Sequence, residues 1–226
     1  MPIPALLNFS SYSFASVNRG TVLGGDFNDD FSTNIGWTQV GTGITVNSGS
    51  LGKLASVGFE STTARVYKSL GLTLSDTLWT AKFEAKITNA AYSSDSENEF
   101  TFFFASNTTY RTYGANIDLI GVLLGQNNFC HSEYKDGTGA WVRSSPITGL
   151  TTGTLFYFTL QRTSATNVRL NIYSDAARTT HVSGSPVDFS IPSTVQSLQY
   201  VSASTSNNYG GVSDVEIDNL EVFNNT

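Results

Sequence analysis

Ser213-Asp214-Val215-Glu216-Ile217-Asp218-Asn219-Leu220-Glu221-Val222-Phe223 carries the clearest strand pattern in this chain. Alternate side chains of a strand point to opposite faces, so Val215 and Ile217 share one face. The next apolar pair, Leu220 and Val222, has the opposite parity. One extra residue near Asp218-Asn219, a β-bulge, returns all four apolar side chains to one face. We therefore predict a bulged strand that closes a core.

The other face of this strand carries three carboxylates, those of Glu216, Asp218 and Glu221. Their spacing resembles the Glu-x-Asp-x-x-Glu strand of laminarinase-like β-glucanases, in which the two glutamates are the nucleophile and the acid/base. Retaining hydrolysis needs two carboxyl groups roughly 5 Å apart, which one face of a bulged strand can supply. This resemblance implies a glycoside hydrolase that uses Glu216 and Glu221.

The same stretch also resembles the closing strand of laminin-G-like and concanavalin A-like lectin domains. In those domains an Ile-Asp-Asn/Asp-aliphatic core, here 217–220, is followed by a further aliphatic residue and an aromatic one, here Val222 and Phe223. The glucanase motif lies in the middle of its chain, whereas five residues follow Glu221 here. The place of the motif near the end of this sequence therefore favours the lectin-like interpretation, in which the strand has no catalytic role.

Two other segments strengthen the lectin-like resemblance, which extends over about residues 25–223. Asp29-Asp30-Phe31-Ser32 is followed shortly by Trp37, as at the start of such domains. The aromatic-rich stretch 155–162 and its partner 168–175 lead into a Tyr-Ser-Asp turn. The resemblance implies an all-β fold, a two-sheet antiparallel β-sandwich of the concanavalin A-like jelly-roll type. Such domains bind glycans, serve as attachment modules or pack as structural parts of surface assemblies.

The strand pattern of the chain agrees with one large β domain. At 226 residues the chain can form a single core. Residues 79–87 alternate between apolar and polar side chains, as do residues 168–173, and Gly and Pro separate the runs. Besides the closing strand, we predict strands at 43–47, 49–56, 63–70, 78–89, 97–106, 116–125, 127–135, 140–144, 154–163, 167–174 and 196–205. The domain is predicted to span residues 25–226.

Composition excludes several classes of partner. Charged residues make up 13% of the chain and the net charge is −6, without a Lys/Arg cluster, so a nucleic-acid-binding face is not expected. No apolar run approaches 18 residues, so no membrane span is predicted. The single Cys130 cannot form an internal disulfide. Cys130 and His131 are strand neighbours that point to opposite faces, which favours a structural role over a metal site or a nucleophile.

Residues 1–24 lie outside the resemblance and are predicted to form an extended arm. They contain no positively charged region before an apolar run, so no signal peptide is recognised. They are nevertheless too apolar for a free tail. We expect the arm to pack on a partner, giving a homo-oligomer or a larger assembly. Its large apolar residues are Ile3, Leu6, Leu7, Phe9, Tyr12 and Phe14.

Two loops have the chemistry of a glycan site, which combines aromatic faces with amide or hydroxyl groups. One loop spans 106–114 and the other spans 206–211. The alternative is that they are ordinary hydrated loops, since such residues dominate turns. The candidate ligand-binding residues are Tyr110, Arg111, Tyr113, Asn207, Asn208 and Tyr209.

A structural calcium ion is a further use for the acidic residues. The first and last strands of such sandwiches lie close together, which would bring the acidic start of the domain to its closing strand. Calcium takes six to eight oxygen ligands. The alternative is a set of solvated acidic loops. The candidate ligands are Asp26, Asp29, Asp30, Asp214 and Asp218.

Taken together, the sequence predicts a non-catalytic lectin-like attachment or structural subunit on the surface of a virus particle or cell, with a glycan or cell-surface polysaccharide as its ligand. The alternatives are a laminarinase-like hydrolase and a purely structural assembly protein without a ligand. A virion or extracellular location follows from the same interpretation.

Overall fold

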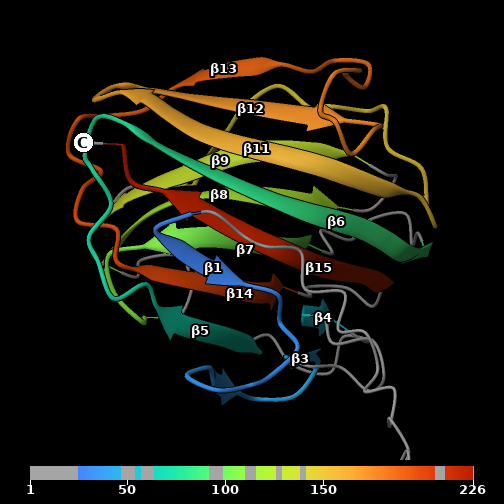
Figure 1. Ribbon diagram of the computed structural model, residues 1–226, viewed down its shortest axis with the longest axis horizontal. Coiled ribbons are helices and arrows are strands. Elements are labelled where there is room, and N and C mark those ends of the chain that lie inside the picture. The colour runs from blue at the N-terminus through green and yellow to red at the C-terminus, as the bar shows by residue number, and fades with distance from the viewer. Residues whose placement is uncertain are drawn as a thin grey trace, which may run out of the picture.

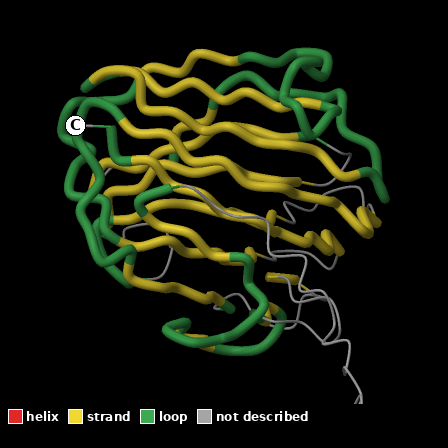
Figure 2. The backbone as a smooth tube through the Cα atoms, viewed as in Figure 1, coloured by secondary structure: helices red, strands yellow, loops and turns green. Residues whose placement is uncertain are grey.

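The computed structural model describes residues 25–46, 54–56, 64–91, 99–109, 116–125, 129–137, 141–206 and 212–225. These residues form strands and the turns between them, and none of them is helical (Figure 2). A helix long and apolar enough to cross a membrane is accordingly absent from these ranges. The predicted arm, residues 1–24, lies outside them.

The described residues form two antiparallel sheets, which we call sheet A and sheet B (Figure 1). Sheet A has eight strands in the order β13-β12-β11-β6-β15-β4-β3, with β1 also paired to β15: β1 (Phe27–Asp29), β3 (Ile44–Thr45), β4 (Leu54–Ser56), β6 (Trp79–Ala91), β11 (Leu155–Ser164), β12 (Asn167–Tyr173), β13 (Val187–Ser190) and β15 (Val212–Phe223). Sheet B has seven in the order β10-β9-β8-β7-β14-β5-β2: β2 (Thr38–Val40), β5 (Arg65–Ser69), β7 (Glu99–Ala105), β8 (Ile117–Gly125), β9 (Cys130–Gly137), β10 (Val142–Arg143) and β14 (Tyr200–Ser206).

The core lies between the two sheets and follows the alternation of the strands. In β6 the odd-numbered residues from Trp79 to Ile87 are at most 3% exposed, and the even-numbered ones lie on the outer face. Aromatic rings of the two sheets pack against each other. The ring centres of Phe83 of β6 and Phe102 of β7 lie 4.9 Å apart, and those of Trp79 and Phe104 lie 5.2 Å apart. Burying each large side chain stabilises the fold by about 1.5–3 kcal/mol.

The predicted bulge in the closing strand is confirmed. The register between β15 and β6 shifts between Asp218 and Glu221, and Asn219 has a φ of 51°. Asparagine tolerates this left-handed conformation better than most residues. As a result Val215, Ile217, Leu220 and Val222 are all 0% exposed. The sandwich predicted from the sequence is therefore the fold of the described residues.

The first and last strands pair directly, as expected, although no strand was predicted at 27–29. Phe27 lies opposite Val222 and Asp29 opposite Leu220. A Cβ added at Gly25 would lie 2.6 Å from the Val222 carbonyl oxygen, so this approach requires glycine. β2 and β13 were not predicted either, because edge strands of three or four residues carry too short a pattern.

Candidate functional site

The six predicted glycan-binding residues, at 110, 111, 113 and 207–209, lie outside the described residues. The strands that lead into their loops are described. β7 ends at Ala105, opposite Tyr200 at the start of β14, whereas β14 ends at Ser206, opposite Glu99 at the start of β7. The two loops therefore leave opposite ends of the β7–β14 pair, roughly 20 Å apart at 3.3 Å per residue. Their role in binding stays a prediction.

The five aspartates predicted to bind calcium are not gathered into one cluster. Asp29 accepts hydrogen bonds from Phe31 N (2.8 Å), Trp37 Nε1 (2.9 Å) and Lys68 Nζ (2.7 Å). Asp29 lies opposite Leu220 of β15. Asp214 pairs with Asn89 and precedes Leu220 by six residues on the same strand, so Asp214 and Asp29 lie roughly 20 Å apart. Among the described residues, no three Asp, Glu, His or Cys side chains are placed to share a metal ion.

Asp26 and Asp30 are likewise held by protein donors. Asp26 Oδ2 accepts a hydrogen bond from Asn224 N at 2.7 Å. The hydroxyl of Ser32, followed by its backbone N–H, lowers the pKa of Asp30 below its ordinary value. Since this carboxylate has a lower pKa in the folded chain than in the unfolded one, it stabilises the fold above about pH 4, and that contribution is lost as the pH falls through the folded value.

Removing calcium should leave the thermal stability of the protein unchanged, because protein donors already use the carboxylates of Asp26, Asp29 and Asp30. An ion held at 100 times its dissociation constant would stabilise by about 2.7 kcal/mol. Differential scanning calorimetry before and after a chelator, and again after added calcium, measures this difference. A melting temperature that falls by several degrees with chelator and returns with calcium would contradict the expectation.

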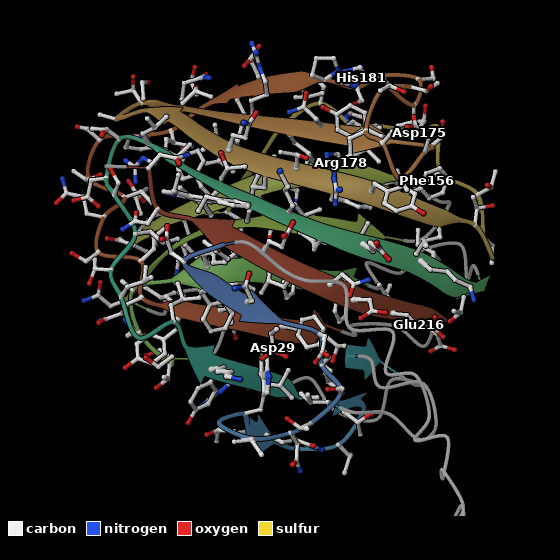
Figure 3. The ribbon with its side chains drawn as sticks, viewed as in Figure 1. Asp29, Phe156, Asp175, Arg178, His181 and Glu216 are labelled. Carbon is white, nitrogen blue, oxygen red and sulfur yellow. The ribbon has the colours of Figure 1, made fainter. Side chains whose placement is uncertain are left out.

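The carboxylate face of β15 is paired with lysines of β6. Glu216 Oε2 lies 3.7 Å from Lys86 Nζ, directly across the strand pair, and Glu221 lies opposite Lys82. Lys86 and Lys82, the β6 residues opposite the two glutamates, are four positions apart, which separates the glutamates by roughly 13 Å along the strands. The Lys86 contact draws the Glu216 carboxylate toward β6. Figure 3 shows Glu216 on β15, on the face turned to the viewer.

Glu216→Gln should change neither the stability nor any activity of the protein by much. The Glu216–Lys86 pair is partly exposed, and such pairs contribute about 0.2–1 kcal/mol. Reducing-sugar release from β-glucans by the parent and the variant, with Glu221→Gln as the matched second variant, tests the hydrolase alternative. Glucan hydrolysis by the parent that both variants abolish would establish catalysis on this strand.

A row of amide and hydroxyl side chains crosses the outer face of sheet A. Gln161 Nε2 of β11 donates to Thr80 Oγ1 of β6 at 3.4 Å, and Asn171 Nδ2 of β12 donates to Gln161 Oε1 at 3.3 Å. Thr159 lies opposite Asn171, and both are 6% exposed. Sequence alternation predicted that Thr80 and Asn171 lie on the polar faces of their strands, but the row they form with Gln161 depends on the register of three strands.

Two tyrosines lie beside this row, two residues further along their strands. Tyr157 of β11 is the cross-strand neighbour of Tyr173 of β12, and both are partly exposed. The turn after β12 returns to them: the Arg178 guanidinium carbon lies 5.7 Å from the centre of the Tyr157 ring, and the His181 ring lies 4.5 Å from that of Tyr173. Figure 3 shows Arg178 in front of the sheet, with Asp175 and His181 near the ends of the strands.

Asp175 organises this turn. Its carboxylate accepts hydrogen bonds from the backbone N–H groups of Thr179 (3.2 Å) and Thr180 (2.6 Å), and its carbonyl oxygen accepts one from Arg178 N (3.0 Å). An antiparallel backbone β-bridge between Tyr173 and His181 closes the turn, and His181 Nδ1 lies 3.2 Å from Ser185 Oγ. These contacts fix the position of Arg178 above the sheet.

The outer face of sheet B differs, because much of it is buried. Phe103, Ala105, Ile117 and Leu119 point away from the central core yet are at most 1% exposed. Glu133 is 0% exposed and lies 3.7 Å from Arg143 Nε. Burial lowers the pKa of Lys135 on the same strand. The polar face of sheet A is therefore the more open of the two.

Cys130 and His131 point to opposite sides of β9, as predicted. Cys130 packs in the central core, and burial raises the pKa of its thiol well above the ordinary value. His131 points outward, with Nδ1 2.8 Å from the Ser144 carbonyl oxygen. Because a carbonyl oxygen only accepts, His131 donates from Nδ1. The pair is not a joint site.

Two hydroxyls on the outer face of sheet B give a matched test of buried hydrogen bonding. Thr101 Oγ1 is buried and has no hydrogen-bond partner among the described residues, whereas Ser202 Oγ donates to the Val66 carbonyl oxygen at 2.9 Å. We expect Thr101→Val to raise the free energy of unfolding by about 1 kcal/mol and Ser202→Ala to lower it by about the same amount. Urea unfolding of both variants measures the changes. Equal destabilisation by both would mean that Thr101 has a partner in solution.

Comparison with known proteins identifies the fold. No known protein family and no curated protein sequence matches the chain. The exoplasmic/lumenal domain of VIP36, solved with Ca²⁺ bound, superposes with a TM-score of 0.59 at 8% identity over 84% of this chain and 84% of that chain. The receptor binding domain of botulinum neurotoxin D superposes with a TM-score of 0.52 at 10% identity over 83% of this chain. This chain covers only 44% of that toxin chain.

A protein of unknown function from Shewanella oneidensis MR-1 gives a TM-score of 0.51 at 12% identity over 82% of this chain and 74% of that chain. Identities this low establish shared architecture alone. Together with the two antiparallel sheets and the bulged closing strand, they show that this chain has the concanavalin A-like jelly-roll fold.

Proposed function

We propose that this domain is a non-catalytic glycan-binding module that binds through the outer face of sheet A. The observation that supports the proposal is the Thr80–Gln161–Asn171 row beside Tyr157 and Tyr173. Sugar rings present apolar faces that pack on aromatic side chains, while amides and hydroxyls orient their hydroxyl groups. Strands hold such groups more rigidly than loops do, which lowers the entropy cost of binding.

A glycan array probed with the purified parent protein tests this function. We expect Tyr157→Ala, and separately the double change Gln161→Ala with Asn171→Ala, to lower affinity for the glycans bound by about tenfold, or about 1.4 kcal/mol. Gln39→Ala on β2 of sheet B is the control, because the Gln39 side chain is exposed and its amide donates to Gly41 O in the adjoining turn. Unchanged binding by both sheet A variants would place the site elsewhere, with the predicted loops at 106–114 and 206–211 as the next candidates.

We further propose that residues 1–24 join the domain to a homo-oligomer or a larger assembly on the surface of a particle or cell. The apolar composition of this segment supports the proposal. Burying one such side chain contributes about 1.5–3 kcal/mol, so three or four can exceed the cost of ordering the arm. Light scattering of the full chain and of a variant without residues 1–24 tests it. Loss of the melting transition in the truncated protein, instead of loss of assembly, would show that the segment belongs to the domain's own core.

A further inference from the structure

Arg178 is placed differently from Arg169, which lies on the same outer face of sheet A. Arg169 binds Asp188 with two hydrogen bonds of 2.9 and 2.8 Å, but Arg178 makes no ion pair within the described ranges. Its guanidinium lies over the Tyr157 ring, and no residue that the structure describes accepts a hydrogen bond from its buried Nε. A buried donor without a partner costs free energy, so it calls for an explanation.

The backbone at Arg178 is also unusual, because its φ is 55°. Long side chains rarely adopt this left-handed conformation, and residues held in it cluster at functional sites. The hydrogen bonds of the Asp175 carboxylate to Thr179 and Thr180 hold the turn in this shape. The guanidinium is thus presented by a fixed turn instead of a mobile arm.

The charged neighbours of Arg178 leave its guanidinium available. Asp175 is occupied by the turn that it caps, and Glu84 lies across from Tyr157 on β6 without an ion pair to Arg178. Elsewhere on this face Lys86 pairs with Glu216, and Lys82 lies 4.9 Å from the Phe223 ring centre. Arg178 is therefore the arginine of this face that is best placed to take an external anion.

We propose that the glycan bound on sheet A is an acidic one and that Arg178 binds its carboxylate or sulfate group while the sugar packs beside Tyr157 and Tyr173. This inference rests on the proposed glycan-binding function and names its ligand class. A guanidinium matches the two oxygens of such groups with parallel hydrogen bonds, which adds specificity as well as affinity. Since the chain carries a net charge of −6, general attraction does not favour an acidic ligand, and a local cation is required.

The test compares pairs of ligands in which one member lacks the acidic group of the other. The probes are an oligogalacturonate, its methyl-esterified form, a sulfated galactan and the uncharged galactan, each titrated calorimetrically against the full chain. We expect the parent to bind either the carboxylated or the sulfated probe at least tenfold more tightly than its uncharged counterpart. The probe that shows this preference identifies the anion.

Arg178→Gln should abolish the preference for the acidic probe, so that the variant binds the charged and uncharged members of a pair about equally. Arg169→Gln is the matched control, because Arg169 lies on the same face but is satisfied by Asp188. If Arg178→Gln does not fold, Arg178→Lys keeps the charge, loses the paired hydrogen bonds and should reduce the preference. Equal binding of charged and uncharged probes by the parent, or an unchanged preference in the Arg178 variants, overturns this inference while leaving glycan binding intact. Failure of the parent to bind any glycan overturns the proposed function itself.

Discussion

Asp29→Ala should lower the free energy of unfolding by about 3 kcal/mol, at the lower end of the range for breaking a buried ion pair. The Asp29 side chain is 7% exposed and forms an ion pair of 2.7 Å with Lys68. It also accepts hydrogen bonds from Trp37 Nε1 and the backbone N–H of Phe31. Alanine leaves all three donors without this acceptor. Lys68, whose side chain is 25% exposed, can still reach water, which limits the loss.

Urea unfolding followed by tryptophan fluorescence measures this change. Asp30→Ala is the matched control, because Asp30 is exposed and its bonds stay within the turn to Ser32, so a loss of at most about 1 kcal/mol is expected. If the two variants were destabilised equally, Asp29 would not connect β1, the Trp37 turn and β5. Asp29→Asn separates charge from shape and should cost less than alanine.

Phe83→Ala should destabilise the domain by about 3–5 kcal/mol, the range for removing a buried aromatic side chain. Phe83 is 0% exposed. The centre of its ring lies 5.0 Å from that of Phe158 in its own sheet and 4.9 Å from that of Phe102 in the facing sheet. Removing the ring leaves a cavity at the contact between the sheets. Rigid strands on both sides limit how far the cavity can collapse.

Chemical denaturation measures the loss, provided that the slope of the unfolding free energy against denaturant concentration is the same in parent and variant. Lys82→Ala is the control. Lys82 precedes Phe83 on the same strand but points to the outer face, where its contact with Phe223 contributes about 0.5–1 kcal/mol. A similar loss from both changes would contradict the assignment of Phe83 to the core and of Lys82 to the surface.

Features that depend on local spacing could be predicted from the sequence. The parity of Val215/Ile217 against Leu220/Val222 required a bulge, and the structure has it at Asn219. Alternation in β6 separated the core residues from Lys82 and its outward neighbours. Strict period-2 patterns determine burial because a strand presents every second side chain to the same face.

Contacts between distant residues could not be predicted in this way, because they depend on how the strands pair. Thr80, Gln161 and Asn171 form one row because β6, β11 and β12 are adjacent in a particular register, which no local pattern encodes. The structure likewise placed Asp29 against Lys68, where the sequence had suggested a calcium ligand, and folded the turn at Asp175 so that Arg178 lies over Tyr157. These contacts arise from strand pairing and turn geometry across the whole sandwich, so they become fixed only when the core forms.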